Sequence, residues 1–274
     1  MIKKNYLEDL NKSKKPFIIY RSNKGFDLYT NFSKKIFLTK NNIEKFINQC
    51  TKLKSKNKET DLFIGFFGYE ILNNLIDIKI KKQKGLKFPK GIFYKPESKI
   101  KLPKKINYKN LETIKSNKIF KININKASYK VIFDKFKKKI KSGETYQIKI
   151  CTKYSNKTQI DALDFFCRLV ESNMAPEAFM IKDKDYSIIS CSPENLINKK
   201  NDLITTKPIA GTLKKTKKLN KIKALAFFKK NVKESKEHNM IVDMERSDLS
   251  RICKAGSVKI LKKKIVEEYK DLYH

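Results

Sequence analysis

Residues 233–253, KESKEHNMIVDMERSDLSRIC, concentrate acidic side chains on a predicted helix in a chain that is otherwise strongly basic. The sequence has 64 Lys and Arg against 28 Asp and Glu, a formal net charge of +36. A helix would place Glu234 and Glu237 on one face, beside Ile241. Two adjacent carboxylates repel each other unless a cation lies between them. The spacing alone favours a solvated face with Glu–Lys pairs; the alternative is a Mg²⁺ site completed by water and substrate.

Three shorter segments place a flexible or polar residue where a ligand could bind. They are GETYQ (143–147), SPENL (192–196) and TTKPIAGTLKK (205–215). Gly211 allows backbone N–H groups to approach an anion closely, although the segment also fits an ordinary turn. Glu194 follows a predicted strand, where it is either a general acid or a helix-start residue. Gln147 is a neutral side chain at the mouth of a strand. None of these segments identifies a function by itself.

Hydrophobic periodicity predicts an α+β fold, with largely antiparallel sheets flanked by helices. The chain alternates blocks of strands and helices with short connections. An amphipathic helix is expected in KASYKVIFDKFKKKIKSG, 126–143, ending near Gly143, and a long helical region over 221–250. The polar segment 96–117 is the predicted linker between an N-terminal region, 1–115, and a C-terminal domain, 122–274. Expected strands after that linker include 146–154, 256–260 and 263–269.

Several classes of protein are disfavoured by composition. The longest apolar run is LFIGFF, 62–67, well short of the roughly 20 residues that span a bilayer. The N-terminus has no apolar core typical of a secretory signal. Five cysteines without paired spacing suit free thiols in a reducing compartment, so we expect a cytoplasmic protein with no membrane partner.

The excess of lysine raises the question of nucleic-acid binding. Base-edge recognition relies strongly on arginine, and the chain has only four: Arg21, Arg168, Arg246 and Arg251. The lysines are spread over nearly the whole chain and do not form one stripe. We therefore expect no specific nucleic-acid partner, and at most weak non-specific attraction to polyanions.

In their order and spacing, the segments resemble the chorismate-utilising enzymes, which include anthranilate synthase component I and aminodeoxychorismate synthase component I. The resemblance is strong from about 125 to 274 and weaker earlier, where FIGFFGYE is similar to a glycine-aromatic strand of the family. The matching segments are GETYQIKICTKY, SCSPENL, TTKPIAGT, KEHNMIVDMERSDLSRICKAGSVKI and IVEEYKDLYH. The resemblance implies the fold of anthranilate synthase component I.

The resemblance also implies roles for individual residues. Glu237 matches the family's Mg²⁺ ligand, with Glu234 as a nearby outer carboxylate, and the metal grips a carboxylate of chorismate. Glu194 matches the acid/base carboxylate at the departing C4 hydroxyl. The turn at Gly211 and Thr212 matches the backbone donors that hold a substrate carboxylate.

A histidine and a partner complete this expectation. His274 matches the histidine implicated in the later elimination of pyruvate, where an imidazole is a suitable proton shuttle. In the family, a glutaminase subunit delivers the ammonia that adds at C2 of chorismate. The resemblance therefore implies Mg²⁺ as cofactor and a glutamine amidotransferase as partner.

Two positions bear on the reaction. Isochorismate- and salicylate-forming relatives use a lysine to activate water where this chain has Gln147, which favours ammonia as the nucleophile. Many aminodeoxychorismate synthases carry a nucleophilic lysine in place of Ala210, so the PIAGT segment favours anthranilate synthase. YQIK and DMERSDL, a short N-terminal region and the lack of a tryptophan-feedback motif favour aminodeoxychorismate synthase. We expect anthranilate as product, with 4-amino-4-deoxychorismate as the alternative.

The end of the chain departs from the family pattern. The family continues well past the histidine that matches His274, with a Gly-Ala-Pro-Lys segment, a substrate arginine and a second Mg²⁺ glutamate. Ser247 and Ser250 also replace the usual Asn and Gly of an Asn-Asp-Leu-Gly run. The resemblance therefore implies a C-terminally truncated domain that is inactive, or nearly so, by itself. A degenerate remnant and a non-specific polyanion binder are the non-catalytic alternatives.

Overall fold

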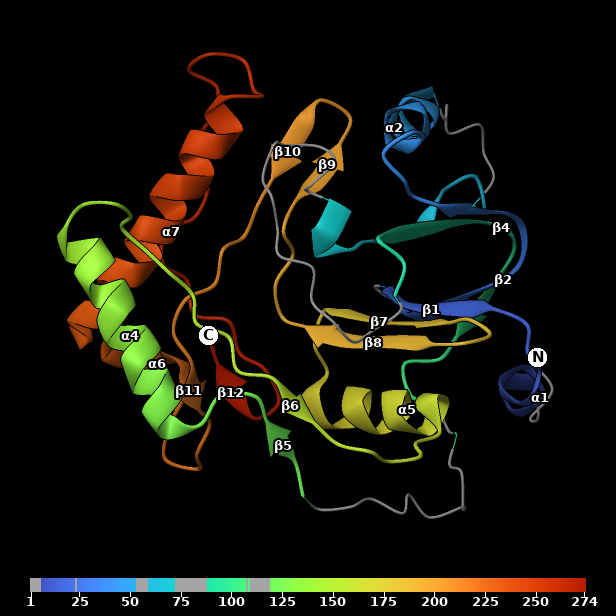
Figure 1. The fold of residues 1–274 in the computed structure, drawn as a ribbon, viewed down its shortest axis with the longest axis horizontal. Helices are drawn as coiled ribbons and strands as arrows, with labels where there is room; N and C mark the ends of the chain where they lie inside the picture. Colours follow the sequence, from blue (N-terminus) through green and yellow to red (C-terminus); the bar gives the residue numbers. More distant parts are fainter. Residues whose placement is uncertain (1–5, 23, 53–58, 72–87, 107, 109–118) are drawn as a thin grey trace. The chain divides into compact units, whose positions relative to one another are not determined.

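The computed structural model describes residues 6–22, 24–52, 59–71, 88–106, 108 and 119–274 (Figure 1). Its contacts divide the chain into two compact units. The first comprises 1–108 and 165–274, and the second comprises 109–164. The first unit therefore joins segments from both sides of the linker that the sequence predicts, so its boundaries differ from the expected regions 1–115 and 122–274.

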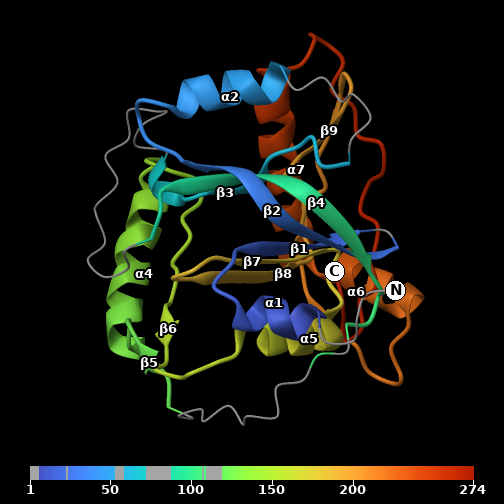
Figure 2. The same cartoon turned by 90° about the vertical axis from the view of Figure 1, so that its right-hand side faces the viewer.

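A six-stranded, wholly antiparallel sheet forms the centre of the first unit, in the order β3-β4-β2-β1-β7-β8. Figure 2 shows the long strands β2 and β4 bending across the unit. The strands are β1 (Phe17–Ser22), β2 (Gly25–Phe37), β3 (Ile64–Phe67), β4 (Gly91–Leu102), β7 (Glu177–Lys182) and β8 (Ser187–Ser192). The antiparallel sheet expected from the sequence is confirmed.

The first half of strand β1, residues 17–19, is buried on both faces, which explains its apolar sequence. Ile18 lies opposite Tyr29 and Ile181 in the register, and these three side chains share one core cluster. The next residue, Ile19, points to the other face and is also fully buried. A central strand covered on both sides holds its register firmly, because a slip of one residue would exchange the two faces.

Helices cover the sheet at several places. From α5 (Ala162–Asn173), Phe166 packs edge-on against Phe26 of β2, with ring centroids 5.8 Å apart. From α2 (Ile43–Lys52), Phe46 packs on Phe93 of β4 at 4.6 Å. Helix α1 (Tyr6–Lys12) and a single 3₁₀ turn (Tyr69–Ile71) complete this part of the unit. The aromatic contacts of Phe166 and Phe46 bury large apolar areas on the sheet.

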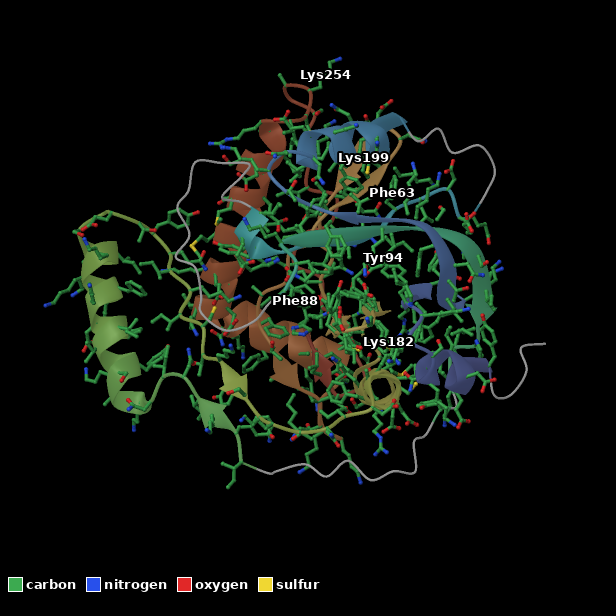
Figure 3. The ribbon with its side chains drawn as sticks, turned by 45° about the vertical axis from the view of Figure 1, so that its right-hand side comes forward. Phe63, Phe88, Tyr94, Lys182, Lys199 and Lys254 are labelled. Atoms are coloured by element: carbon green, nitrogen blue, oxygen red, sulfur yellow. The ribbon has the colours of Figure 1, made fainter. Side chains whose placement is uncertain are left out.

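A buried polar cluster ties the turn between β7 and β8 to the long strands. Tyr94 of β4, labelled in Figure 3, donates a hydrogen bond to Asp183, and Lys35 of β2 forms an ion pair with the same carboxylate at 2.6 Å. The backbone N–H of Lys184 donates to the other carboxylate oxygen at 2.7 Å. Burial opposes ionisation, but the hydrogen bonds from Lys35 and Tyr94 keep the pKa of Asp183 below its ordinary value.

The described part of the first unit also contains the hairpin of β9 and β10, a ladder between β11 and β12, and two helices. The helical region expected over 221–250 is confirmed, with a break at Asn231, which ends α6 and caps α7. The Asn231 side chain accepts the N–H of Glu234 at 3.2 Å. The elements are β9 (Asn198–Lys200), β10 (Leu203–Thr205), β11 (Leu213–Lys214), α6 (Lys221–Lys230), α7 (Val232–Ser250) and β12 (Leu272–Tyr273).

The second unit contains the amphipathic helix α4 (Lys126–Lys141), as the sequence predicts, and a short ladder between β5 (Lys121–Ile122) and β6 (Tyr154–Ser155). The strand expected over 146–154 is wrong for most of its length, because only Tyr154 is in a strand. Alternating apolar residues form a strand only where a neighbouring strand completes the hydrogen bonds.

Two other expectations need correction. The predicted linker 96–117 begins inside β4, where Pro96 lies at the register shift opposite Phe32. Such an irregularity tolerates a proline because no regular ladder bond is required there. Residues 107 and 109–118 of that linker lie outside the described part of the chain. Likewise, 256–260 and 263–269 form no regular strand, and an isolated bridge joins Glu268 to Tyr273.

Candidate functional site

A tight hairpin at the end of the chain positions His274. Its backbone exchanges two hydrogen bonds with Glu267, at 2.8 and 2.9 Å, and Tyr269 N–H donates to Leu272 at 2.8 Å. Strand alternation then turns neighbouring side chains to opposite faces. Tyr273 is buried in a core cluster with Ala224 and Val266, and His274 emerges on the other face. The apolar tyrosine therefore anchors the hairpin that presents the imidazole.

The imidazole of His274 is held against the turn 208–212. Its Nδ1 lies 2.9 Å from the carbonyl oxygen of Gly211 and 3.3 Å from the hydroxyl of Thr212. A carbonyl only accepts hydrogen bonds, so Nδ1 carries the proton. In the neutral ring, Nε2 is then the nitrogen with the free electron pair. This is the state required of a proton acceptor.

Gly211 has a positive φ of 82° and is closely surrounded. A Cβ at this position would lie 2.8 Å from Cε1 of Phe228 and 3.2 Å from Oε2 of Glu234. Both the backbone conformation and the space therefore require glycine. Within the described residues, the N–H groups of Ala210, Gly211 and Thr212 have no hydrogen-bond acceptor. The Glu234 carboxylate thus lies near a turn whose backbone N–H groups have no acceptor among the described residues.

Glu194 is linked to the same turn from the end of β8. Its Oε1 accepts the N–H of Ile209 at 2.9 Å. Its own N–H donates to the hydroxyl of Ser192 at 3.2 Å, which fixes the local bend. The Glu194 side chain is exposed, so an external group can reach it. Turn 208–212 therefore brings together three of the residues that the sequence singles out: Glu194, Glu234 and His274.

The acidic residues of α7 have different surroundings. Asp243 is exposed and lies 3.4 Å from Arg246, which fits a solvated helix face. Glu245 accepts a hydrogen bond from Thr206 at 2.7 Å. Glu234 and Glu237 are half-buried, and the Oε2 of Glu234 lies 3.2 Å from the position that a Cβ on residue 211 would take. The acid cluster therefore does not act as a single unit.

The described residues include no group of three or more His, Cys, Asp or Glu side chains arranged to hold a metal ion. A Mg²⁺ site does not require such a group, since Mg²⁺ keeps several waters and binds through one or two carboxylates plus substrate oxygens. The pair Glu234 and Glu237, one turn apart on α7, provides two such carboxylates. The donor set fits Mg²⁺.

Gln147, which the sequence also singles out, is exposed and belongs to the second unit. A role for Gln147 beside the 208–212 turn therefore stays a prediction.

Sequence reasoning missed Tyr269. Its hydroxyl donates to the carbonyl of Pro193 at 3.3 Å, and its ring meets that of His274 edge-on at 5.3 Å. Burial raises the pKa of Tyr269, and the charges of Glu267 and Glu194 raise it further. The sequence EEYKDLYH contains a usable signal, because hairpin alternation places Tyr269 and His274 on one face.

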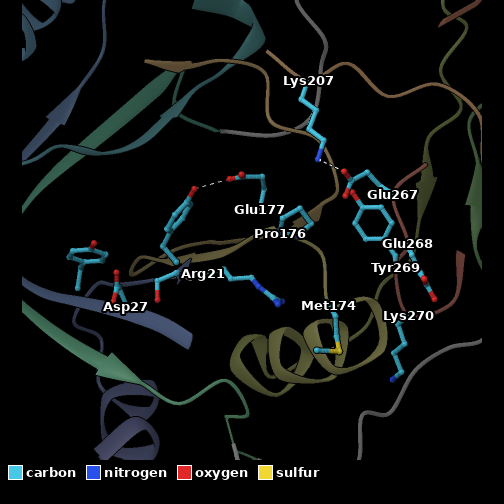
Figure 4. Close-up of a pocket in the computed structure, with 13 residues that line it drawn as sticks. Arg21, Asp27, Met174, Pro176, Glu177, Lys207, Glu267, Glu268, Tyr269 and Lys270 are labelled. Atoms are coloured by element: carbon cyan, nitrogen blue, oxygen red, sulfur yellow. Dashed lines mark hydrogen bonds and ion pairs between the residues drawn. The ribbon is translucent and has the colours of Figure 1, made fainter. Parts of the chain in front are cut away.

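A cavity of about 960 Å³ is lined in part by the Tyr269 segment (Figure 4). Two polar pairs mark its wall: Tyr20 donates to Glu177 at 2.7 Å, and Lys207 pairs with Glu267 at 2.8 Å. Burial and the bond to Glu177 raise the pKa of Tyr20. The lining consists of Tyr20–Ser22, Asp27, Tyr29, Met174, Pro176, Glu177, Lys207 and Glu267–Lys270. It excludes Glu194, Glu234 and Glu237, although Lys207 directly precedes the 208–212 turn and Tyr269 packs on His274.

The fold and this turn define an α+β protein with a glycine turn, two acidic elements and a histidine in one place. The family model described as chorismate binding enzyme matches residues 4–274. The chain therefore belongs to the chorismate binding enzyme family. The crystal structure of anthranilate synthase component I from Streptococcus pneumoniae TIGR4 superposes with a TM-score of 0.69, covering 94% of this chain and 65% of that chain at 23% identity. This likeness confirms the expected fold.

Curated relatives carry two names. Aminodeoxychorismate synthase component 1 of Bacillus subtilis is 35% identical over 142 residues, covering 52% of this chain and 30% of the relative. An anthranilate synthase component I-like protein of Synechocystis sp. is 26% identical over 238 residues, covering 77% and 49%. Anthranilate synthase component 1 of Bacillus subtilis is 29% identical, covering 77% and 38%. The chain spans half or less of the length of these relatives. In addition, no helix among the described residues is both long and apolar enough to span a bilayer.

Proposed function

We propose that this chain binds chorismate at the 208–212 turn and forms the substrate site of a complete enzyme that aminates chorismate. The observation that carries the proposal is the convergence on this turn of Glu194 and His274 by hydrogen bonds, with the Glu234 carboxylate beside the position that a Cβ on residue 211 would take. Chorismate is a small ring compound with two carboxylates. The backbone donors of Gly211 and Thr212 suit one carboxylate, as in other anion-binding turns.

Glu234 and Glu237 would hold Mg²⁺ through their carboxylates. When bound, the ion supplies positive charge for a substrate carboxylate and relieves the repulsion between the two glutamates. The high positive charge of the chain also favours the approach of an anionic substrate.

Glu194 and His274 are suited to opposite proton transfers. Glu194 gives a proton to the departing C4 hydroxyl, which leaves as water while ammonia adds at C2. For anthranilate, the C2 proton then goes to Nε2 of His274 as the C3–O bond breaks and the side chain leaves as pyruvate. The bond from Nδ1 to the Gly211 carbonyl fixes the tautomer that this second step requires.

Anthranilate is the product that we propose, with ammonia supplied by a glutaminase partner. Ala210 has no side chain that can attack the ring, and the neutral Gln147 does not activate water as a lysine does. The alternative product is 4-amino-4-deoxychorismate. The 35% identity to an aminodeoxychorismate synthase component 1 favours that alternative.

The products that a complete enzyme containing this chain forms from chorismate, with Mg²⁺ and ammonium, distinguish these reactions. A fluorescent product that co-elutes with anthranilate supports the first proposal. Formation of 4-amino-4-deoxychorismate supports the alternative, and formation of neither product contradicts the proposed amination. Adding a glutaminase subunit and glutamine in place of ammonium then tests the partner.

Replacing Glu194 separates chemistry from binding. We expect Glu194→Gln to lower kcat by roughly 10²–10⁴-fold, the usual contribution of a general acid, while chorismate binding changes little. The matched control is Asp243→Asn, an exposed acid on α7 that should leave both quantities unchanged. Equal losses of kcat in the two variants would contradict the role of Glu194.

A further inference from the structure

Tyr269 contacts the side chain of His274 and the backbone directly before Glu194, the two residues that the proposed reaction uses for proton transfer. Its hydroxyl bonds to the carbonyl of Pro193, the residue directly before Glu194, and its ring packs on the imidazole of His274. We propose that Tyr269 is a positioning residue that holds the Glu194 bend and the His274 ring in one fixed arrangement. The catalytic consequence rests on the proposed function, whereas the positioning itself does not.

The imidazole needs a second contact besides its hydrogen bond. The bond from Nδ1 to Gly211 fixes one atom of the ring and leaves rotation about that bond open. The Tyr269 ring meets the imidazole at an interplanar angle of 79°, an edge-to-face geometry that aromatic pairs prefer. Together the two contacts define the plane of the ring and the direction of Nε2.

The hydroxyl of Tyr269 contacts the bend that carries Glu194. It is half-buried, and its bond at 3.3 Å reaches across 76 residues of sequence to the bend after β8. Burial and the nearby carboxylates raise its pKa, so the phenol stays protonated and able to donate. With that hydroxyl engaged by Pro193, Tyr269 is placed to support the neighbouring groups and not to exchange protons itself.

The backbone fixes the tyrosine in turn. Tyr269 N–H donates to Leu272, the Lys207–Glu267 ion pair holds the start of the hairpin, and Lys215 N–H donates to Asp271 at 2.9 Å. Figure 4 shows Tyr269 beside Glu267 on this segment. A side chain on so short a closed hairpin has little freedom to move, as a positioning residue requires.

NMR of the two histidines tests the inference without any turnover. With ¹³C,¹⁵N-labelled histidine, the protein gives imidazole signals from His274 and His238 alone. The ¹⁵N shifts, measured above pH 8 where an imidazole is neutral, report which nitrogen carries the proton. The variants are Tyr269→Leu, which removes the ring, and Tyr269→Phe, which removes only the hydroxyl.

We expect Tyr269→Leu to shift the His274 ring signals and to change its Nδ1–H form into a mixture of tautomers. Tyr269→Phe should keep the ring shift of His274. The matched control is Tyr273→Phe, which removes a similar hydroxyl-to-carbonyl bond, 3.2 Å to Leu219, on the opposite face of the same hairpin. The control should leave His274 unchanged, and His238 should be unchanged in all three variants.

Activity provides a second measurement. In Tyr269→Phe, kcat should fall roughly tenfold with KM within about twofold, because the acid is misplaced while substrate contacts remain. His274 signals in Tyr269→Leu that match those of the unaltered protein would overturn the inference. A complete enzyme that aminates no chorismate, although the His274 signals respond as expected, would contradict the proposed function and leave the positioning intact.

Discussion

At the scale of single residues, Gly211 explains why so small a turn can gather so many groups. Its positive φ and its contact with Phe228 leave no room for a side chain. The absence of a side chain lets Glu234 come close and leaves adjacent N–H groups open to a ligand. The glycine in the segment TTKPIAGT is therefore required for steric reasons.

Replacing Gly211 by alanine should destabilise the protein by about 2–3 kcal/mol, since it adds a steric clash to the strain of a positive φ. Gly143→Ala is the control, because Gly143 also has a positive φ, 77°, but nothing within 4 Å of a Cβ. We expect that control to lose only about 1 kcal/mol, the strain term alone. Denaturant unfolding measures both. Equal losses would show that the close packing around Gly211 is unimportant.

At the scale of elements, the junction between α6 and α7 sets the position of the metal-ligand candidates. Asn231 ends the first helix and caps the second through Glu234 N–H. The first turn of α7 therefore begins at a fixed place beside Gly211. A negative side chain in that first turn is also stabilised by the helix dipole.

Removing this cap tests whether the junction serves the site. Asn231→Ala should cost about 1 kcal/mol of stability and weaken Mg²⁺-dependent chorismate binding, because Glu234 loses its anchor. Asn220→Ala removes the equivalent cap of α6, whose side chain accepts Lys223 N–H at 2.9 Å. That control should lose similar stability and keep its affinity. Calorimetry and thermal unfolding measure the two effects, and equal affinities in both variants would contradict the idea.

The buried carboxylate of Asp183 predicts a pH dependence of stability. Its pKa is lower folded than unfolded, so its contribution is fully present above the unfolded pKa of about 3.9 and is lost as pH falls through the folded pKa. Asp183→Asn should therefore be less stable by about 1–3 kcal/mol at pH 7, and the gap should narrow below about pH 4. Asp185→Asn, an exposed neighbour, is the control. A gap that is constant between pH 7 and pH 3 would contradict this account.

The elements also show how far the sequence could be read. The apolar periodicity of 126–141 and of 221–250 predicted α4, α6 and α7, because helices satisfy their own backbone bonds. Alternation over 146–154 and 256–260 was misleading, because a strand depends on a distant partner. For the same reason Tyr269, whose partners lie 76 residues away or across a hairpin, was not found.

At the scale of the molecule, the central sheet joins the two separate stretches of sequence that form the first unit. Strand β1 pairs with β2 on one side and with β7 on the other, so the first unit cannot form from 1–108 alone. β8 continues from that sheet directly into the bend at Glu194. The N-terminal strands therefore support the site indirectly, by holding the hairpin that carries this residue.

The account depends most directly on whether this chain binds chorismate through a divalent ion. Isothermal titration of the 274-residue protein with chorismate, with and without Mg²⁺, measures this. The account predicts saturable binding only with Mg²⁺, weakened in Glu237→Gln and in Glu234→Gln but not in Asp243→Asn. Binding that is independent of Mg²⁺, or equal in all three variants, would contradict it.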